Sequence, residues 1–179
     1  MSNSFTASLR GAARGRLPSL AGVLAAALAV AACSMPTHPD SAAGPSNPLN
    51  PAAVQLLDDT SWVLQSAQTS DGHPAFDVPA DKGAAPTLML DTRSGQRRAS
   101  GFAGCNRFSG TYALTSGKLT FGTLATTRKA CGSEADGLER AYLGALAQAS
   151  TTLVQMRPPQ QMRIIAATGV TLTFVREDR

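Results

Sequence analysis

The sequence predicts an α+β fold: a single small domain in which an antiparallel β-sheet of about seven or eight strands packs with one α-helix. Short segments with alternating apolar residues recur between Trp62 and Phe174. Glycine-containing tight turns separate several of these segments. Only one stretch, from Leu138 to Ala149, has apolar residues at helical spacing. Strands therefore dominate the expected fold.

The expected strands place apolar side chains at every second position, as Trp62 and Leu64 do. Ser116-Gly117 and Thr168-Gly169 predict tight turns between consecutive strands, because glycine adopts the positive φ that such turns need. The strand segments, in chain order, are TSWVLQSA, PTLMLD, RRASGFAG, TYALT, KLTFG, TTLVQM, MRIIAA and VTLTFV.

The expected helix lies between the fifth and sixth strands and covers the sheet. Ser133 is its predicted N-cap, and Glu134 and Asp136 in the first turn favour the positive end of the helix dipole. The apolar stripe consists of Leu138, Ala141, Tyr142, Ala145, Leu146 and Ala149. The glycine- and proline-containing segment Gln65–Pro86 is expected to form a long loop, with a short strand around Phe76.

The N-terminal segment has the features of an export signal. Basic Arg10, Arg14 and Arg16 precede an apolar run from Leu20 to Ala32. This run is shorter than the roughly 20 residues that a membrane-spanning helix needs. We therefore predict cleavage rather than a transmembrane anchor.

The end of the apolar run, Val30-Ala31-Ala32-Cys33, resembles the lipobox of bacterial lipoproteins. The resemblance implies cleavage before Cys33, a diacylglycerol on its sulfur and an acyl group such as palmitate on its new amine. An ordinary small-residue cleavage site is the alternative. Ser34 rather than Asp at the next position favours sorting to the outer membrane. We expect the lipid to hold the protein on the membrane, with the domain facing the periplasm.

These features divide the chain into a signal peptide (1–32), a lipidated cysteine with a flexible linker rich in Pro, Ala and Ser (33–58), and a folded domain (59–177). Three of the 16 basic residues lie in the signal, so the rest of the chain carries 13 basic and 12 acidic residues. This near balance argues against a nucleic-acid partner, which needs a concentrated basic surface.

Cys105 and Cys131 remain after modification of Cys33. Export to an oxidising compartment favours a disulfide between them, with two free buried thiols as the alternative. Nucleophilic chemistry lacks an evident base, because His73 is the single histidine of the expected domain. A zinc site would need about four N or S ligands. We therefore predict no catalytic residue, metal or cofactor.

The domain resembles the META domain family, which includes the HslJ-type heat-inducible lipoproteins. The resemblance rests on SWVL, GFAGCNRFSGTYAL, GKLTFGTLATTRKAC, the helix and GVTLTFVR. It implies a small α+β fold, lipid anchoring, and a link to envelope stress and antibiotic tolerance, without a catalytic residue set. The matching motif residues are Gly104, Cys105, Asn106, Gly110, Tyr112, Thr127 and Cys131.

Three functions are compatible with these features. The first is a non-enzymatic envelope lipoprotein that binds a protein or a hydrophobic ligand and supports stress resistance. The second is an inhibitor of a periplasmic or host hydrolase that inserts the loop Gln68–Gly83. The third is an enzyme using Asp71, His73 and Asp77, in which histidine would act as the base. The first is our leading hypothesis, because no set of acids, bases or metal ligands converges in the sequence.

Overall fold

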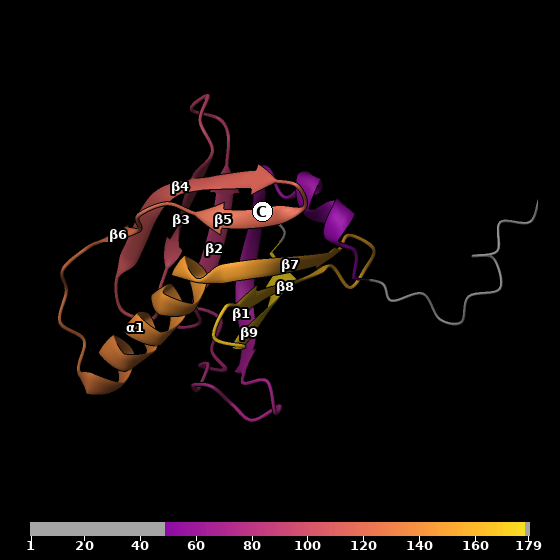
Figure 1. The fold of residues 1–179 in the computed structure, drawn as a ribbon. Helices are drawn as coiled ribbons and strands as arrows, with labels where there is room; N and C mark the ends of the chain where they lie inside the picture. Colours follow the sequence, from indigo (N-terminus) through magenta and orange to yellow (C-terminus); the bar gives the residue numbers. More distant parts are fainter. Residues whose placement is uncertain (1–48, 178–179) are drawn as a thin grey trace, which may run out of the picture. The chain divides into compact units, whose positions relative to one another are not determined.

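The computed structural model describes residues 49–177, and the predicted signal peptide and Cys33 lie outside them. The described chain forms an antiparallel sheet with one main α-helix, which confirms the predicted fold class (Figure 1). The elements, in chain order, are η2 (Pro51–Leu56), β1 (Thr60–Gln68), β2 (Thr87–Asp91), β3 (Arg98–Phe102), β4 (Arg107–Thr115), β5 (Lys118–Phe121), β6 (Ala125–Thr126), α1 (Ser133–Ala147), β7 (Ala149–Gln155), β8 (Gln161–Ala166) and β9 (Thr171–Arg176).

The sheet is bent into a nearly closed barrel. Its strands follow the order β5-β4-β3-β2-β1-β9-β8-β7, and each neighbouring pair is antiparallel. The end strands β5 and β7 lie beside each other but do not form a strand pair (Figure 1). We call this junction, at which the barrel stays open, the seam. The short β6 pairs with β4 outside this path. The first strand of the sheet, β1, therefore lies between β2 and the last strand, β9.

Both predicted tight turns are present. Ser116 and Gly117 join β4 to β5 with φ values of 50° and 74°. Gly169 lies between β8 and β9 with a φ of 89°. Positive φ values are unfavourable for most residues with a Cβ, so glycine suits both places.

Residues 50–57, which we assigned to the flexible linker, belong to the folded domain. Val54 and Leu57 are fully buried, and η2 packs against β7 and β5 at the seam. Asn50 exchanges two backbone hydrogen bonds with Val154 of β7, at 2.9 and 3.3 Å. The expected linker boundary at residue 58 is therefore too late, because two apolar side chains are enough to fix this proline-containing turn against the barrel.

The predicted start of the loop Gln65–Pro86 is wrong, because the first residues of this range belong to β1. β1 continues to Gln68, and its register with β9 shifts at Gln65, where a β-bulge is inserted. A bulge adds one residue to one strand, so the alternation of apolar residues changes phase there. The expected strand around Phe76 is also absent, since that part of the loop contains only an isolated bridge between Gln68 and Pro74.

The helix lies where the sequence predicts it, with a difference at each end. It ends at Ala147, so Ala149 of the predicted stripe is the first residue of β7 instead. Gly132 is the N-cap, with a φ of 93°, and Ser133 is the first helical residue rather than the cap. Glu134 and Asp136 occupy the first turn as expected. No helix in the described part of the chain has the length and apolar character needed to cross a membrane.

Tyr142 joins the helix to the barrel core. Its ring is fully buried and lies 6.0 Å from the ring of Phe108 and 6.3 Å from that of Phe174, measured between centroids. Its hydroxyl donates a hydrogen bond to the carbonyl of Thr87 (3.1 Å), which satisfies the buried polar atom. Burial raises the pKa of the Tyr142 phenol far above its usual value. The side chain is therefore neutral and its role is packing.

Candidate functional site

The predicted disulfide between Cys105 and Cys131 is present, with a Cα–Cα distance of 5.8 Å. It joins the bend between β3 and β4 to the segment that leads into α1. The two sulfurs and a carboxylate oxygen of Asp136 lie within 4.8 Å of one another. Because the sulfurs are bonded to each other, neither is available as a thiolate ligand. The cluster is therefore a structural disulfide with a carboxylate beside it at the start of the helix.

Asn106 connects three segments through one buried side chain and its own backbone. Its Oδ1 accepts hydrogen bonds from the hydroxyl of Thr127 (2.8 Å) and the backbone N–H of Lys129 (2.7 Å). Its Nδ2 donates to the carbonyl of Lys129 (3.0 Å). Its backbone N–H donates to the carboxylate of Glu139 in α1 (2.9 Å). Asn106 therefore holds the segment before α1 against the start of β4.

Two motif glycines allow close contacts at this place. A Cβ on Gly104, whose φ is 99°, would lie 2.6 Å from Cδ2 of Leu138 in α1. A Cβ on Gly110 would lie 2.6 Å from the carbonyl oxygen of Thr123. Both distances are shorter than any normal contact. A side chain at Gly104 would displace the Leu138 side chain and strain the positive φ, whereas one at Gly110 would push the backbone of the 122–126 segment outward.

Tyr112, the remaining motif residue, lies in a separate ion-pair network. Its hydroxyl donates to Oδ1 of Asp58 (2.5 Å), and the same carboxylate accepts from Nε and NH2 of Arg97 (3.0 and 2.8 Å). The Arg97 hydrogen bond holds the pKa of Asp58 below its usual value. Burial, followed by the Asp58 carboxylate, raises the pKa of the Tyr112 phenol. The network ties the start of the domain to β3 and β4.

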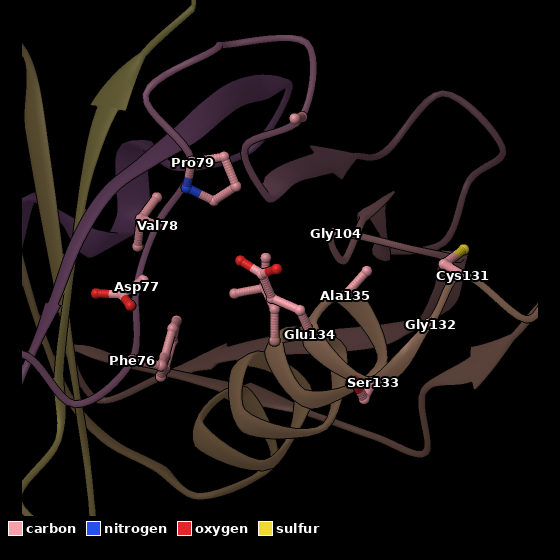
Figure 2. A pocket seen from close by; sticks show the side chains of 12 residues that line it. Phe76, Asp77, Val78, Pro79, Gly104, Cys131, Gly132, Ser133, Glu134 and Ala135 are labelled. Carbon is pink, nitrogen blue, oxygen red and sulfur yellow. The ribbon is translucent and has the colours of Figure 1, made fainter.

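The motif thus contributes mainly to the framework, while a cavity lies next to it between the loop after β1 and the start of α1 (Figure 2). We call it the helix-loop cavity; its volume is about 690 Å³. Sequence reasoning missed it, because its two walls are about 50 residues apart and the motif residues Gly104 and Cys131 at its edge indicate a structural role. Its lining residues are Phe76, Asp77, Val78, Pro79, Ala84, Gly104, Cys131, Gly132, Ser133, Glu134, Ala135 and Leu138.

The residues of the enzyme hypothesis do not form a catalytic arrangement in the described structure. Asp71 and His73 are exposed at the tip of the loop, whereas Asp77 lies at the helix-loop cavity. Within residues 49–177, none of the three side chains has a hydrogen-bond or ion-pair partner. A general base needs an orienting partner and a proton within reach, and the structure brings neither to His73.

A family model, the META domain, matches residues 55–179. The chain belongs to the META domain family. The match begins four residues before the predicted boundary at 59 and includes part of η2 and the buried Leu57. No curated protein matches this META domain chain.

Solved structures similar to this META domain protein include an NMR structure of a protein from Burkholderia xenovorans. The two are 56% identical; the similarity covers 80% of this chain and 99% of the other, with a TM-score of 0.69. A second NMR structure is 28% identical and covers 68% and 92% of the two chains, with a TM-score of 0.48. A crystal structure of a DUF4847 family protein from Bacteroides vulgatus is 9% identical and covers 70% and 97%, also at 0.48.

Proposed function

We propose that this META domain protein is a lipid-anchored, non-enzymatic component of the bacterial cell envelope. It would support stress or antibiotic tolerance by binding an apolar ligand, or an apolar segment of a partner protein, in the helix-loop cavity. The cavity is the observation that carries the proposal. Its volume of about 690 Å³ lies within the range of roughly 300–1,000 Å³ typical of small-molecule sites.

Apolar side chains line both walls of the helix-loop cavity, and polar groups share the lining. Phe76, Val78 and Pro79 line one side, and Leu138 and Ala135 line the other. Phe76 and Val78 are partly buried against the barrel core, which fixes the position of the loop wall. A preformed apolar site loses less entropy on binding than a mobile one.

Binding in the helix-loop cavity can be tested by filling it. Val78→Trp places a large ring at the cavity, whereas Ala80→Trp puts the same ring on a neighbouring exposed position outside the lining. We expect native mass spectrometry of residues 44–179, which lack Cys33 and are isolated without detergent, to detect a bound apolar molecule in the wild type and in Ala80→Trp, but not in Val78→Trp. Absence of any bound mass, together with no amide shifts at residues 76–79 when octanol is added, would contradict the proposal.

The proposed localisation in the cell envelope depends on the lipobox-like segment Val30-Ala31-Ala32-Cys33. We expect intact-mass analysis to give a chain that begins at Cys33 and carries a diacylglycerol and one further acyl group. Cys33→Ser should abolish both additions and release the domain from the outer-membrane fraction. An unmodified chain that keeps its first 32 residues would refute the anchoring.

A hydrolase inhibitor is the second candidate, because the tip of the loop after β1 is exposed and internally braced. The N–H and hydroxyl of Thr69 both donate to the carbonyl of His73 (2.8 and 3.1 Å), and Gln68 bridges to Pro74. A turn held in this way could enter a cleft with little ordering cost. Inhibition of lysozymes and proteases, lost when Asp71-Gly72-His73 is replaced by glycines, would favour this candidate over ligand binding.

A further inference from the structure

We infer that the helix-loop cavity selects amphiphiles with a positively charged head: an alkylammonium group beside Glu134 and an alkyl chain along Phe76, Val78 and Leu138. The inference rests on the proposed function, since it names the ligand class of the same cavity. It depends on two observations. The first is which charged side chains line the cavity, and the second is which of the nearby carboxylates already have hydrogen-bond partners.

The charged side chains at the helix-loop cavity have one sign. Its lining includes the carboxylates of Asp77 and Glu134 and no lysine, arginine or histidine. A neighbouring cavity of about 500 Å³ has the opposite character, because Arg107 and Lys129 line it and no acidic residue does. An anionic amphiphile would therefore meet side chains of opposite charge at the second cavity. A cationic amphiphile would meet them at the helix-loop cavity.

Glu134 is the carboxylate placed to meet a ligand. Figure 2 shows its side chain projecting from the first turn of α1 toward the segment Phe76–Pro79, while the carboxylate of Asp77 points away from the helix. Within the described residues, no hydrogen-bond donor or cation contacts Glu134. The other acidic groups near the helix start are engaged: Asp136 accepts from the N–H of Cys131 (3.4 Å), and Glu139 accepts from Asn106 (2.9 Å).

Apolar walls beside a carboxylate favour a ligand that has both an alkyl chain and a cationic head. The alkyl chain would gain from burial at the loop and helix walls, where each methylene removed from water contributes favourably. A cation next to Glu134 would gain Coulomb energy without displacing an existing partner. An anionic head would instead be repelled by the same carboxylate, and a neutral head would gain nothing from it.

Helix stabilisation is the alternative role for Glu134, because a carboxylate in the first turn interacts favourably with the helix dipole. That role predicts a change in stability on substitution and no change in ligand preference. The two roles therefore differ in a measurable ratio, the affinity for a cationic ligand divided by the affinity for a neutral ligand of the same chain length.

The test uses residues 44–179, which form a compact unit containing the whole described core. Octylamine, octanol and octanoate are titrated at neutral pH and low salt, and amide shifts of residues 76–79 and 132–138 report binding by NMR. We expect octylamine to bind about two- to fivefold more tightly than octanol, because Glu134 is exposed and exposed ion pairs provide a gain of this size. Added salt should reduce this preference.

Glu134→Gln should bring the ratio of octylamine to octanol affinity close to one while octanol still binds. Asp71→Asn, which removes the same charge from the exposed tip of the loop, should leave the ratio unchanged. The inference fails if the wild type shows no preference for octylamine, if octanoate binds in this cavity as well as octylamine does, or if Glu134→Gln keeps the preference. If octanol binds and only the preference is missing, the proposed apolar site stands and the charge selection does not; if none of the three ligands binds, both are refuted.

Discussion

Asn106 shows how one side chain can specify a local fold. A primary amide offers both a carbonyl acceptor and two N–H donors, and Asn106 uses both ends on the segment that contains Thr127 and Lys129. Aspartate would lack the donor and leucine would lack both functions. Asn106 has only 6% of its surface exposed, and its replacement would remove all three of these hydrogen bonds at once.

Asn106→Ala should lower the free energy of unfolding by about 2–3 kcal/mol, because three side-chain hydrogen bonds would be lost and each contributes about 1 kcal/mol. Urea unfolding followed by tryptophan fluorescence measures the change, since Trp62 is fully buried in the core. The exposed Thr115→Ala in β4 is the control and should change stability by less than about 0.5 kcal/mol. An Asn106→Ala variant as stable as this control would contradict the role assigned to Asn106.

Asp58 makes stability depend on acid. Its pKa in the folded protein lies below the ordinary value of 3.8, mainly through the hydrogen bond with Arg97. Its contribution is therefore fully present above the unfolded-state pKa and is lost as the pH falls through the folded-state pKa. The stability difference between wild type and Asp58→Asn should stay constant near neutrality and shrink on acidification below about 4. Unfolding curves across this range test it, and a difference independent of pH would rule it out.

At the scale of elements, the segment between β5 and α1 depends on its attachments. It contains only the two-residue strand β6 as regular structure, and both residues of that strand are exposed. Asn106, the hydrogen bond from Thr127 N–H to the carbonyl of Arg107 (3.0 Å) and the disulfide hold it in place. Few apolar side chains of its own contribute to its position.

Replacing both Cys105 and Cys131 with serine should lower the free energy of unfolding by about 3 kcal/mol, as expected for closure of a loop with a sequence separation of 26. Amide exchange in residues 122–132 should accelerate more than exchange in β1, because β1 is paired on both sides. Wild type treated with a reducing agent provides the comparison. Equal acceleration in both segments would show that the disulfide acts on the whole barrel instead.

Most elements were predictable, because their burial follows a simple period. Leu172 and Phe174 alternate with less buried residues in β9, and the turn at Ser116-Gly117 has an explicit glycine signal. The phase change at the bulge in β1 was not predictable, since Gln65 looks like any exposed strand residue. The strand β6 carries no apolar pattern at all. These failures occur where long-range contacts decide the local structure.

At the scale of the whole molecule, the seam between β5 and β7 determines where the domain begins. η2 packs against both strands there and buries Val54 and Leu57 completely. Its Leu56, by contrast, is 58% exposed. The N-terminal turn is thus a structural part of the barrel, although its composition resembles that of a linker.

A chain that starts at Asp59, the boundary expected from the sequence, should be less stable than one that starts at Gly44. Loss of the buried Val54 and Leu57 should cost about 3–6 kcal/mol, at roughly 1.5–3 kcal/mol for each side chain. Loss of Asp58 with its bonds to Arg97 and Tyr112 adds to this cost. Urea unfolding of the two chains measures this cost. Leu56→Ser in the longer chain is the control and should have little effect. Equal stability of the two chains would show that η2 is dispensable.

The helix-loop cavity could not be predicted from the sequence, because it depends on the tertiary arrangement of the whole domain. Its walls come from Phe76–Pro79 and from the start of α1, two segments distant in the sequence that only the tertiary fold brings to one cavity. Neither Val78 nor Glu134 belongs to a local pattern that differs from an ordinary loop or helix start. The cysteine and asparagine motif could be found in the sequence, and it lies at the edge of this cavity through Cys131.

The pairing of β1 with β9 also affects how the protein is made. Thr60–Gln68 cannot complete its backbone ladder until Thr171–Arg176 has been synthesised, so a nascent chain cannot acquire its central strand contacts early. Such delayed closure is expected to slow folding, because distant pairings form after the intervening loop has been ordered. A polypeptide that is threaded from its N-terminus through a narrow channel would therefore lack the β1–β9 and β8–β9 ladders, and with them the continuous sheet, until its final strand arrives.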